Sequence, residues 1–197
     1  MSLRLIPLAA LLVSAPAAAQ FSESQSYKFL KAVRDAKNEE VVNMLDAPGQ
    51  TIINARDIST GEGALHIVVK RGDGLYLRYL LTKGADPNLR DDRGNTPLLL
   101  AAQHGQGEMI DALIGARANV NLANASGETP LIRAVQKRDL ALTRTLLAAN
   151  ANPDQTDNIA GMSARDYAHA DDRSPAIAKL IDATPKSSTR GVAGPKF

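Results

Sequence analysis

The most constraining feature of this sequence is a repeat with a period of 33 residues. The stretch DPNLRDDRGNTPLLLAAQHG, which begins at Asp86, is followed 33 residues later by NVNLANASGETPLIRAVQKR. The period continues beyond this pair, with a last interval one residue longer, as shown by the glycines at Gly61, Gly94, Gly127 and Gly161. A unit this short leaves apolar surface exposed on both flanks, so stacked neighbours must supply a continuous core. The repeat therefore predicts a solenoid.

Each unit carries the signals of two helices. In the stretch TPLLLAAQHG, Thr96 supplies a capping hydroxyl before Pro97, a residue suited to the first position of a helix, and the helix runs to a turn at Gly105. A second helix follows, with an apolar stripe that includes Ile110 and Leu113. The chain then passes through segments such as ADPNLRDDRG, which are rich in turn-forming residues. The pattern predicts an all-α fold of helix, turn, helix and extended turn.

The unit GNTPLLLAAQHGQGEMIDALIGARANVN resembles an ankyrin repeat in its Gly-x-Thr-Pro-Leu opening, its central glycine, its paired aliphatic residues and its Gly-Ala-x-x-Asn close. The segment FLKAVRDAKNEEVVNMLD resembles a first, more divergent unit. The resemblance implies an all-α ankyrin-repeat solenoid of about five helix-turn-helix units joined by extended β-turn loops. We expect the domain to span residues 26–183, and its units to span 26–57, 58–90, 91–123, 124–157 and 158–183.

Several positions depart from the family pattern. Only the second unit has the family histidine, as His66. The turn between the two helices has Ala36 in the first unit and Arg138 in the fourth, where the second and third units have Gly72 and Gly105. At the end of the second helix, Arg117 and Asn150 replace glycine, and a left-handed backbone there would strain the arginine by roughly 1 kcal/mol. We expect the third and fourth units to be individually weaker for this reason.

The two ends of the chain differ from the repeats. Residues 1–19 combine Arg4, a short apolar stretch and a run of alanines, which is the pattern of a secretory signal peptide cleaved between Ala19 and Gln20. We expect a short linker over residues 20–25 and export, most simply to a periplasm. Residues 184–197 contain three basic residues and no acid, and predict a disordered basic tail, with weak attraction to anionic lipid as a hypothesis.

Composition excludes several functional classes. The chain has no cysteine, which excludes disulfides and cysteine-ligated metals, and its formal net charge is +2. This near-neutral charge, the few aromatic residues and the predicted export argue against nucleic-acid binding. No segment of the mature chain is long and apolar enough to span a membrane. The histidines His66, His104 and His169 are scattered and belong to no metal or hydrolase motif, so we expect no cofactor, no metal site and no enzyme.

The resemblance implies a partner-binding surface, because ankyrin repeats use their concave face, formed by inner helices and turn tips, to bind proteins. Carried onto the matching positions, the inner-helix part of this surface consists of Arg34, Lys70, Arg71, Gln103, His104, Gln136 and Lys137. The turn-tip part consists of Asp92, Arg93, Asn95, Ser126 and Glu128, with Ser59, Thr60, Glu62 and Ala125 beside them.

The inner-helix set contains cations and no acid, so we expect a protein partner with an acidic surface. The predicted function is a non-catalytic, exported scaffold for protein–protein interaction. One alternative is a protective companion that stabilises a periplasmic enzyme or assembly. A further alternative is a hydrolase or metal enzyme built on a repeat scaffold. The residues alone identify neither the partner nor the oligomeric state.

Overall fold

A computed structural model describes residues 24–49 and 51–185. The predicted signal peptide, its cleavage site at Ala19 and Gln20, and residues 186–197 of the predicted tail lie outside the described residues. Within the described residues no strand forms, and ten α-helices and one 3-10 turn follow one another. The elements are α1 (Gln25–Arg34), α2 (Asn38–Asp46), η1 (Ile52–Asn54), α3 (Ala64–Arg71), α4 (Gly74–Thr82), α5 (Pro97–His104), α6 (Gly107–Gly115), α7 (Pro130–Gln136), α8 (Leu140–Ala148), α9 (Ala164–Ala170) and α10 (Pro175–Asp182).

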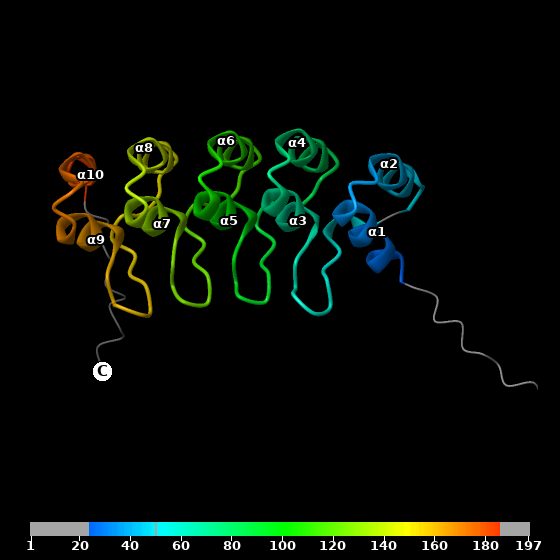
Figure 1. Ribbon diagram of the computed structural model, residues 1–197, viewed down its shortest axis with the longest axis horizontal. Coiled ribbons are helices and arrows are strands. Elements are labelled where there is room, and N and C mark those ends of the chain that lie inside the picture. Colours follow the sequence, from blue (N-terminus) through cyan, green and yellow to red (C-terminus); the bar gives the residue numbers. More distant parts are fainter. Residues whose placement is uncertain (1–23, 50, 186–197) are drawn as a thin grey trace, which may run out of the picture.

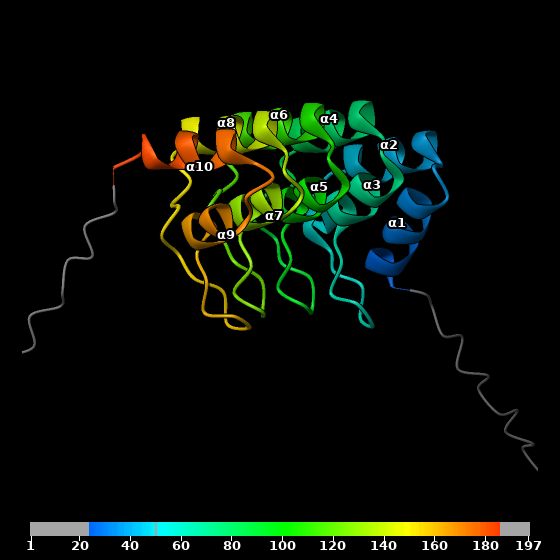
Figure 2. The same cartoon turned by 60° about the vertical axis from the view of Figure 1, so that its left-hand side comes forward.

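The helices form two layers. The odd-numbered helices make an inner row, the even-numbered helices make an outer row, and long loops extend from the inner row away from the outer helices (Figure 1 and Figure 2). Each inner helix packs on the next inner helix and on the outer helix of its own unit. The all-helical solenoid predicted from the repeat is confirmed.

The helix starts expected from the sequence are present. The Thr96 hydroxyl accepts the amide of Leu99 at 3.2 Å and caps α5, and Thr129 caps α7 in the same way. At α9, Ser163 and Asp166 form a reciprocal capping box. These side chains satisfy amides that an α-helix leaves unpaired at its first turn.

The backbone is left-handed at the four positions where another residue replaces glycine. The backbone φ is +56° at Ala36, +58° at Arg138, and +65° at both Arg117 and Asn150. Asparagine tolerates this conformation, whereas alanine and arginine are strained by about 1 kcal/mol relative to glycine. The sequence departures from the family pattern therefore fall at real points of backbone strain.

Stacking of the units joins their backbones through long side chains. In the inner helices α1, α3 and α5, a carbonyl of the last turn accepts a hydrogen bond from a side chain of the next unit. The three pairs are Arg71 Nη1 to Val33 O at 2.6 Å, Gln106 Nε2 to Val69 O at 2.9 Å, and Lys137 Nζ to Gln103 O at 2.7 Å. These hydrogen bonds thus connect each of these helices to the unit that follows it.

Four loops connect the outer helix of one unit to the inner helix of the next. Their closing backbone pairs define loop 1 (57–62), loop 2 (91–95), loop 3 (124–128) and loop 4 (157–162). Adjacent loops are joined by one backbone hydrogen bond each: Asp92 N to Thr60 O at 3.0 Å, Ala125 N to Arg93 O at 2.9 Å, and Asn158 N to Ser126 O at 2.9 Å. The four loops therefore form one continuous row, called the loop row below.

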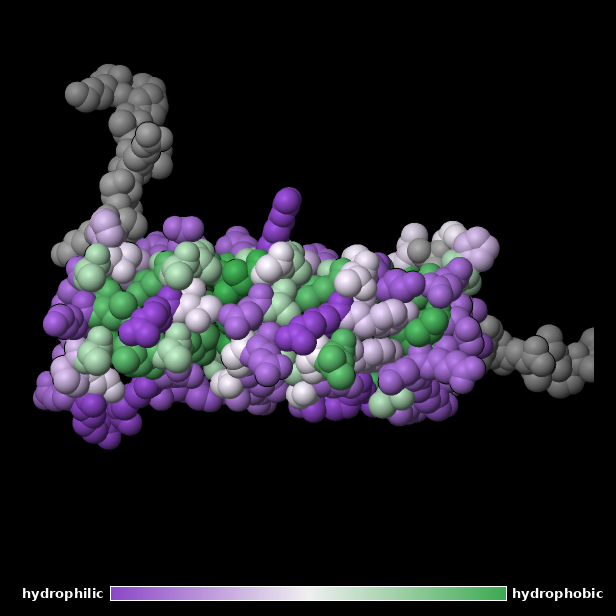
Figure 3. Space-filling model, turned by 90° about the horizontal axis from the view of Figure 1, so that it is seen from above, coloured by the Kyte–Doolittle hydropathy of each residue, from purple (hydrophilic) through white to green (hydrophobic). Residues whose placement is uncertain are grey.

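The face formed by the outer helices has a mixed character. Seen from that side, hydrophobic and hydrophilic side chains share the surface along the whole row (Figure 3). Leu75 on α4 is the most exposed large apolar side chain that the described helices carry, at 80%. No helix among the described residues is long and apolar enough to cross a membrane.

Contact between neighbouring loops requires glycine. At Gly94 φ is +77° and an added Cβ would lie 2.9 Å from the backbone nitrogen of Ala125, whereas at Gly161 φ is +65° and an added Cβ would meet nothing within 4 Å. We expect Gly161→Ala to cost about 1 kcal/mol, from the left-handed backbone alone. Gly94→Ala should cost about 1–3 kcal/mol more, because loop 3 must move. Denaturant unfolding of the two variants measures the difference, and equal losses would contradict the role of loop contact.

Candidate functional site

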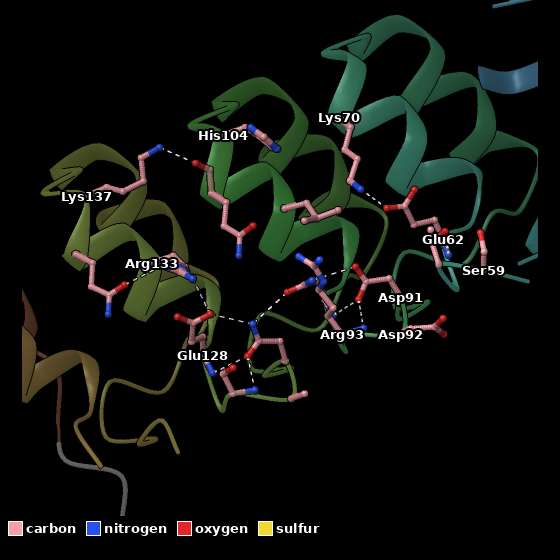
Figure 4. A pocket seen from close by; sticks show the side chains of 18 residues that line it. Ser59, Glu62, Lys70, Asp91, Asp92, Arg93, His104, Glu128, Arg133 and Lys137 are labelled. Atoms are coloured by element: carbon pink, nitrogen blue, oxygen red, sulfur yellow. Dashed lines mark hydrogen bonds and ion pairs between the residues drawn. The ribbon is translucent and has the colours of Figure 1, made fainter. Parts of the chain in front are cut away.

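A groove of about 1300 Å³ lies between the inner helices and loops 1 to 3 (Figure 4). The side chains from α3, α5 and α7 that line it are Lys70, Leu100, Gln103, His104, Arg133, Gln136 and Lys137. Those from the loops are Ser59, Thr60, Glu62, Asp91, Asp92, Arg93, Asn95, Asn124, Ala125, Ser126 and Glu128. The groove is thus a largely polar trough across three units.

Each loop is held in shape by the side chain of its own first residue. In loop 2, Asp91 accepts the amides of Arg93 at 2.9 Å and Asn95 at 2.7 Å. Asn124 accepts two amides of loop 3 in the same manner. These turns fix the loop tips without help from a ligand.

A chain of hydrogen bonds runs along the base of the loops. Asn95 Nδ2 donates to Asp91 at 3.0 Å, and Asn124 Nδ2 donates both to Asn95 Oδ1 at 3.1 Å and to Glu128 Oε2 at 2.9 Å. Arg133 completes the chain with a 2.7 Å ion pair to Glu128. Asp91, Asn95 and Glu128 are buried, so this network stabilises the wall of the groove rather than presenting free groups to a ligand.

Most of the charged side chains in the groove already have partners. Lys70 pairs with Glu62, and Asp92 pairs at 3.3 Å with Arg56, which directly precedes loop 1. Lys137 donates to a backbone carbonyl. The exceptions are Arg93 and His104, whose side chains are exposed and make no hydrogen bond or ion pair with any residue that the structure describes.

His66 lies buried behind the groove and joins two units. Its Nδ1 accepts the Gly63 amide at 3.2 Å, so Nε2 carries the proton and donates to the Asn95 carbonyl at 3.0 Å. Burial lowers the pKa of His66 below the ordinary value of 6.5, and the charges of Asp91, Glu62 and Lys70 act on it more weakly. His66 is therefore neutral in the folded protein and positions loop 2.

The repeated helices and loops match a known protein family. A family model described as ankyrin repeats, in three copies, matches residues 29–124 and 65–157, which together make up more than half of the chain. The chain belongs to the ankyrin-repeat family. Ankyrin repeats generally mediate protein–protein interaction, and the groove lies between the parts that each ankyrin unit repeats, namely its inner helix and its loop.

The curated relatives share only short stretches with the chain. An ankyrin repeat protein of Acanthamoeba polyphaga mimivirus is 41% identical over 73 residues, which are 36% of this chain and 10% of the relative. The p110 subunit of nuclear factor NF-kappa-B from Drosophila melanogaster is 36% identical over 26% of this chain and 5% of its own length. Oxysterol-binding protein homolog 1 of Saccharomyces cerevisiae is 46% identical over 24% of this chain and 4% of its own length. The chain thus spans a tenth or less of these relatives.

The structure brings ten of the twelve predicted partner-binding residues to the groove. They are Lys70, Asp92, Arg93, Asn95, Gln103, His104, Ser126, Glu128, Gln136 and Lys137. Asn95 and Glu128 are buried in the wall, because the polar network along the loop bases holds their side chains.

Arg34 and Arg71, the other two predicted residues, do not line the groove. Arg34 forms an ion pair with Asp57 at 3.1 Å. Arg71 donates to the Val33 carbonyl, pairs with Asp73 at 3.1 Å and lies over the ring of Tyr76. Both guanidinium groups thus pair with acceptors of their own scaffold outside the groove, and their role in partner binding stays a prediction.

Sequence reasoning missed four lining residues, namely Asp91, Leu100, Asn124 and Arg133. A signal for two of them was present, because an aspartate or asparagine opens the loops at residues 57, 91, 124 and 157, which are spaced by 34, 33 and 33 residues. Among the described residues, no group of three or more histidines, aspartates or glutamates is arranged to hold a metal ion.

The neutral state of His66 predicts a pH dependence of stability. Because its pKa is lowered in the folded state, the unfolded chain takes up the proton first, and the free energy of unfolding falls as the pH drops below about 6.5. The slope from this group can reach about 1.4 kcal/mol per pH unit. We expect His66→Leu, which copies Leu99 of the next unit, to remove this slope between pH 7 and 5 in chemical unfolding. His104→Gln is the matched control and should keep it.

Proposed function

We propose that the chain is an exported, non-catalytic scaffold that binds a partner protein with an acidic surface through the groove. The unpaired side chain of Arg93 carries the proposal. The carboxylates of Glu62, Asp92 and Glu128 are each paired with a cation of the scaffold. The side chains of Arg93 and His104 have no acceptor among the described residues, so a ligand that supplies carboxylates complements the site.

The size and polarity of the groove favour a protein over a small molecule. Pockets for small molecules are mostly apolar and have volumes of about 300–1000 Å³. This groove is larger, at about 1300 Å³, and only Leu100 contributes a large aliphatic side chain to it. The amide groups of Gln103 and Gln136 can donate to and accept from a peptide backbone as well as side chains. Protein binding is also the general use of ankyrin repeats.

Export is supported by the sequence of residues 1–19. A basic start, a short apolar stretch and small residues before the proposed cut are the features that secretion machinery recognises. A chain without cysteine is chemically suited to an oxidising compartment, because it has no thiol to form unwanted disulfides. We therefore place the working protein in the periplasm or an equivalent exported location.

The contribution of Arg93 can be measured by charge reversal. We expect Arg93→Glu to weaken capture of the partner from periplasmic extract about tenfold, because a carboxylate then faces the acidic ligand. Arg144→Glu is the matched control, since Arg144 is an exposed arginine of the outer helix α8. The same charge change there should leave capture intact. Equal capture by all three proteins, measured by quantitative mass spectrometry, would contradict the groove as the binding site.

Export can be tested on the protein made in a Gram-negative host from its full sequence. We expect the periplasmic fraction to contain a chain whose N-terminal residue is Gln20, as read by N-terminal sequencing. Replacing Ala19 by Arg should block the cut, because signal peptidase requires a small residue there. Recovery of the unaltered protein only in the cytoplasm, still beginning with Met1, would contradict export.

A further inference from the structure

Two exposed isoleucines stand at opposite ends of the loop row. Ile58 in loop 1 is 97% exposed and Ile159 in loop 4 is 75% exposed. Their loops each enclose one residue more between the closing backbone pairs than loops 2 and 3 do. At the corresponding tips, loop 2 has Asp92 and Arg93 and loop 3 has Ala125 and Ser126, so large apolar side chains occur only on the two longer, outer loops.

Both outer tips are rigid before any partner arrives. In loop 1, Asp57 accepts the amides of Ser59 at 2.9 Å and Thr60 at 3.2 Å. In loop 4, Asp157 accepts the amides of Ile159 at 3.1 Å and Ala160 at 2.8 Å. Hydrogen bonds from the Ser59 and Tyr167 hydroxyls hold the pKa values of Asp57 and Asp157 below their usual range, so both carboxylates keep these roles at neutral pH. An apolar side chain on a fixed tip loses little conformational entropy on binding.

The loop row also fixes the distance between the two isoleucines. One backbone hydrogen bond joins each loop to the next, from loop 1 through loops 2 and 3 to loop 4. The separation of Ile58 and Ile159 therefore follows from the stacking of the units and does not depend on flexible segments. A ligand confined to the groove would not touch either of them, because neither lines it.

The middle of the loop row carries one unpaired cation, Arg93. Asp92 is paired with Arg56, which directly precedes loop 1. Arg93 makes no ion pair with a described residue, so its positive charge is unpaired. From end to end, the loop row thus presents an apolar anchor, a cation and a second apolar anchor. The other large apolar side chains that are exposed in the described structure, Tyr27 and Leu75, lie on the helices α1 and α4 and not on this edge.

We propose that Ile58 and Ile159 are paired anchors through which the loop row docks a folded partner protein, whose surface carries carboxylates between two apolar depressions. The inference rests on the proposed function, since it assigns the type of partner. Contacts at both ends of a rigid row require a partner that is itself wide and folded. A short acidic peptide in the groove would use Arg93 and leave both isoleucines in water.

Site-specific photo-crosslinking in the cells that make the protein tests this inference on the full chain. A photoreactive phenylalanine analogue is placed at position 58, 159, 126 or 75, one at a time. Position 126 reports on the groove and position 75 on the outer helices. We expect positions 58, 159 and 126 to crosslink to one and the same folded protein, and position 75 to give no crosslink to it.

The partner identified by crosslinking is then purified on its own, and its affinity for variants of this chain gives the contribution of each isoleucine to binding. Ile58→Ser and Ile159→Ser should each weaken binding about tenfold or more, since burial of an isoleucine side chain is lost. Leu75→Ser is the matched control and should bind like the unaltered protein. All three side chains are exposed, so identical thermal unfolding is the check that each variant is folded.

The outcomes separate this inference from the proposed function. Crosslinks at position 126 alone, or unchanged affinity of both isoleucine variants, would overturn the anchors and leave groove binding intact. Crosslinks from positions 58 and 159 to different proteins, or to a second copy of this chain, would also overturn them. If none of the positions 58, 126 and 159 crosslinks to any protein, both the anchors and the proposed function fail.

Discussion

Stacking between neighbouring units is the interaction on which the rest of the structure depends. A single pair of short helices has neither the length nor the buried surface to be stable, because helix nucleation is costly and both flanks are apolar. Stacking buries those flanks, closes the ends of the inner helices and joins the loops into one row. The groove is a consequence of the same stacking, since its wall consists of equivalent positions from three successive units.

Most of the fold could be predicted from the sequence, because its determinants are local and repeated. A threonine directly before a proline, such as Thr96, is a helix cap in each unit that contains the pair. Gly94 adopts the left-handed conformation because it lacks a side chain. The strain at Arg117 could be anticipated for the same reason, because the position within the unit sets the backbone conformation. The repeat pattern therefore predicts where the helices begin and where the backbone turns.

The site was less predictable, because side chains make their contacts across units. Arg71 and His104 occupy equivalent positions one period apart, yet Arg71 turns to the Val33 carbonyl while His104 remains exposed at the groove. Whether a long side chain faces a ligand or its own scaffold depends on which acceptors the preceding unit offers. The period identifies the position of a residue but not the acceptor that it finds.

This competition between scaffold and ligand determines which residues are available for binding. The cations Lys70, Arg133 and Lys137 all face the groove, but each already has an acceptor within the protein. A partner that took them over would leave a carboxylate or a helix carbonyl without its donor, and that loss would offset the new contact. Arg93 gives up no such interaction with the described residues, so a carboxylate that binds it adds stability without an internal loss. The affinity of the groove for acidic ligands therefore depends more on Arg93 than on the number of its basic residues.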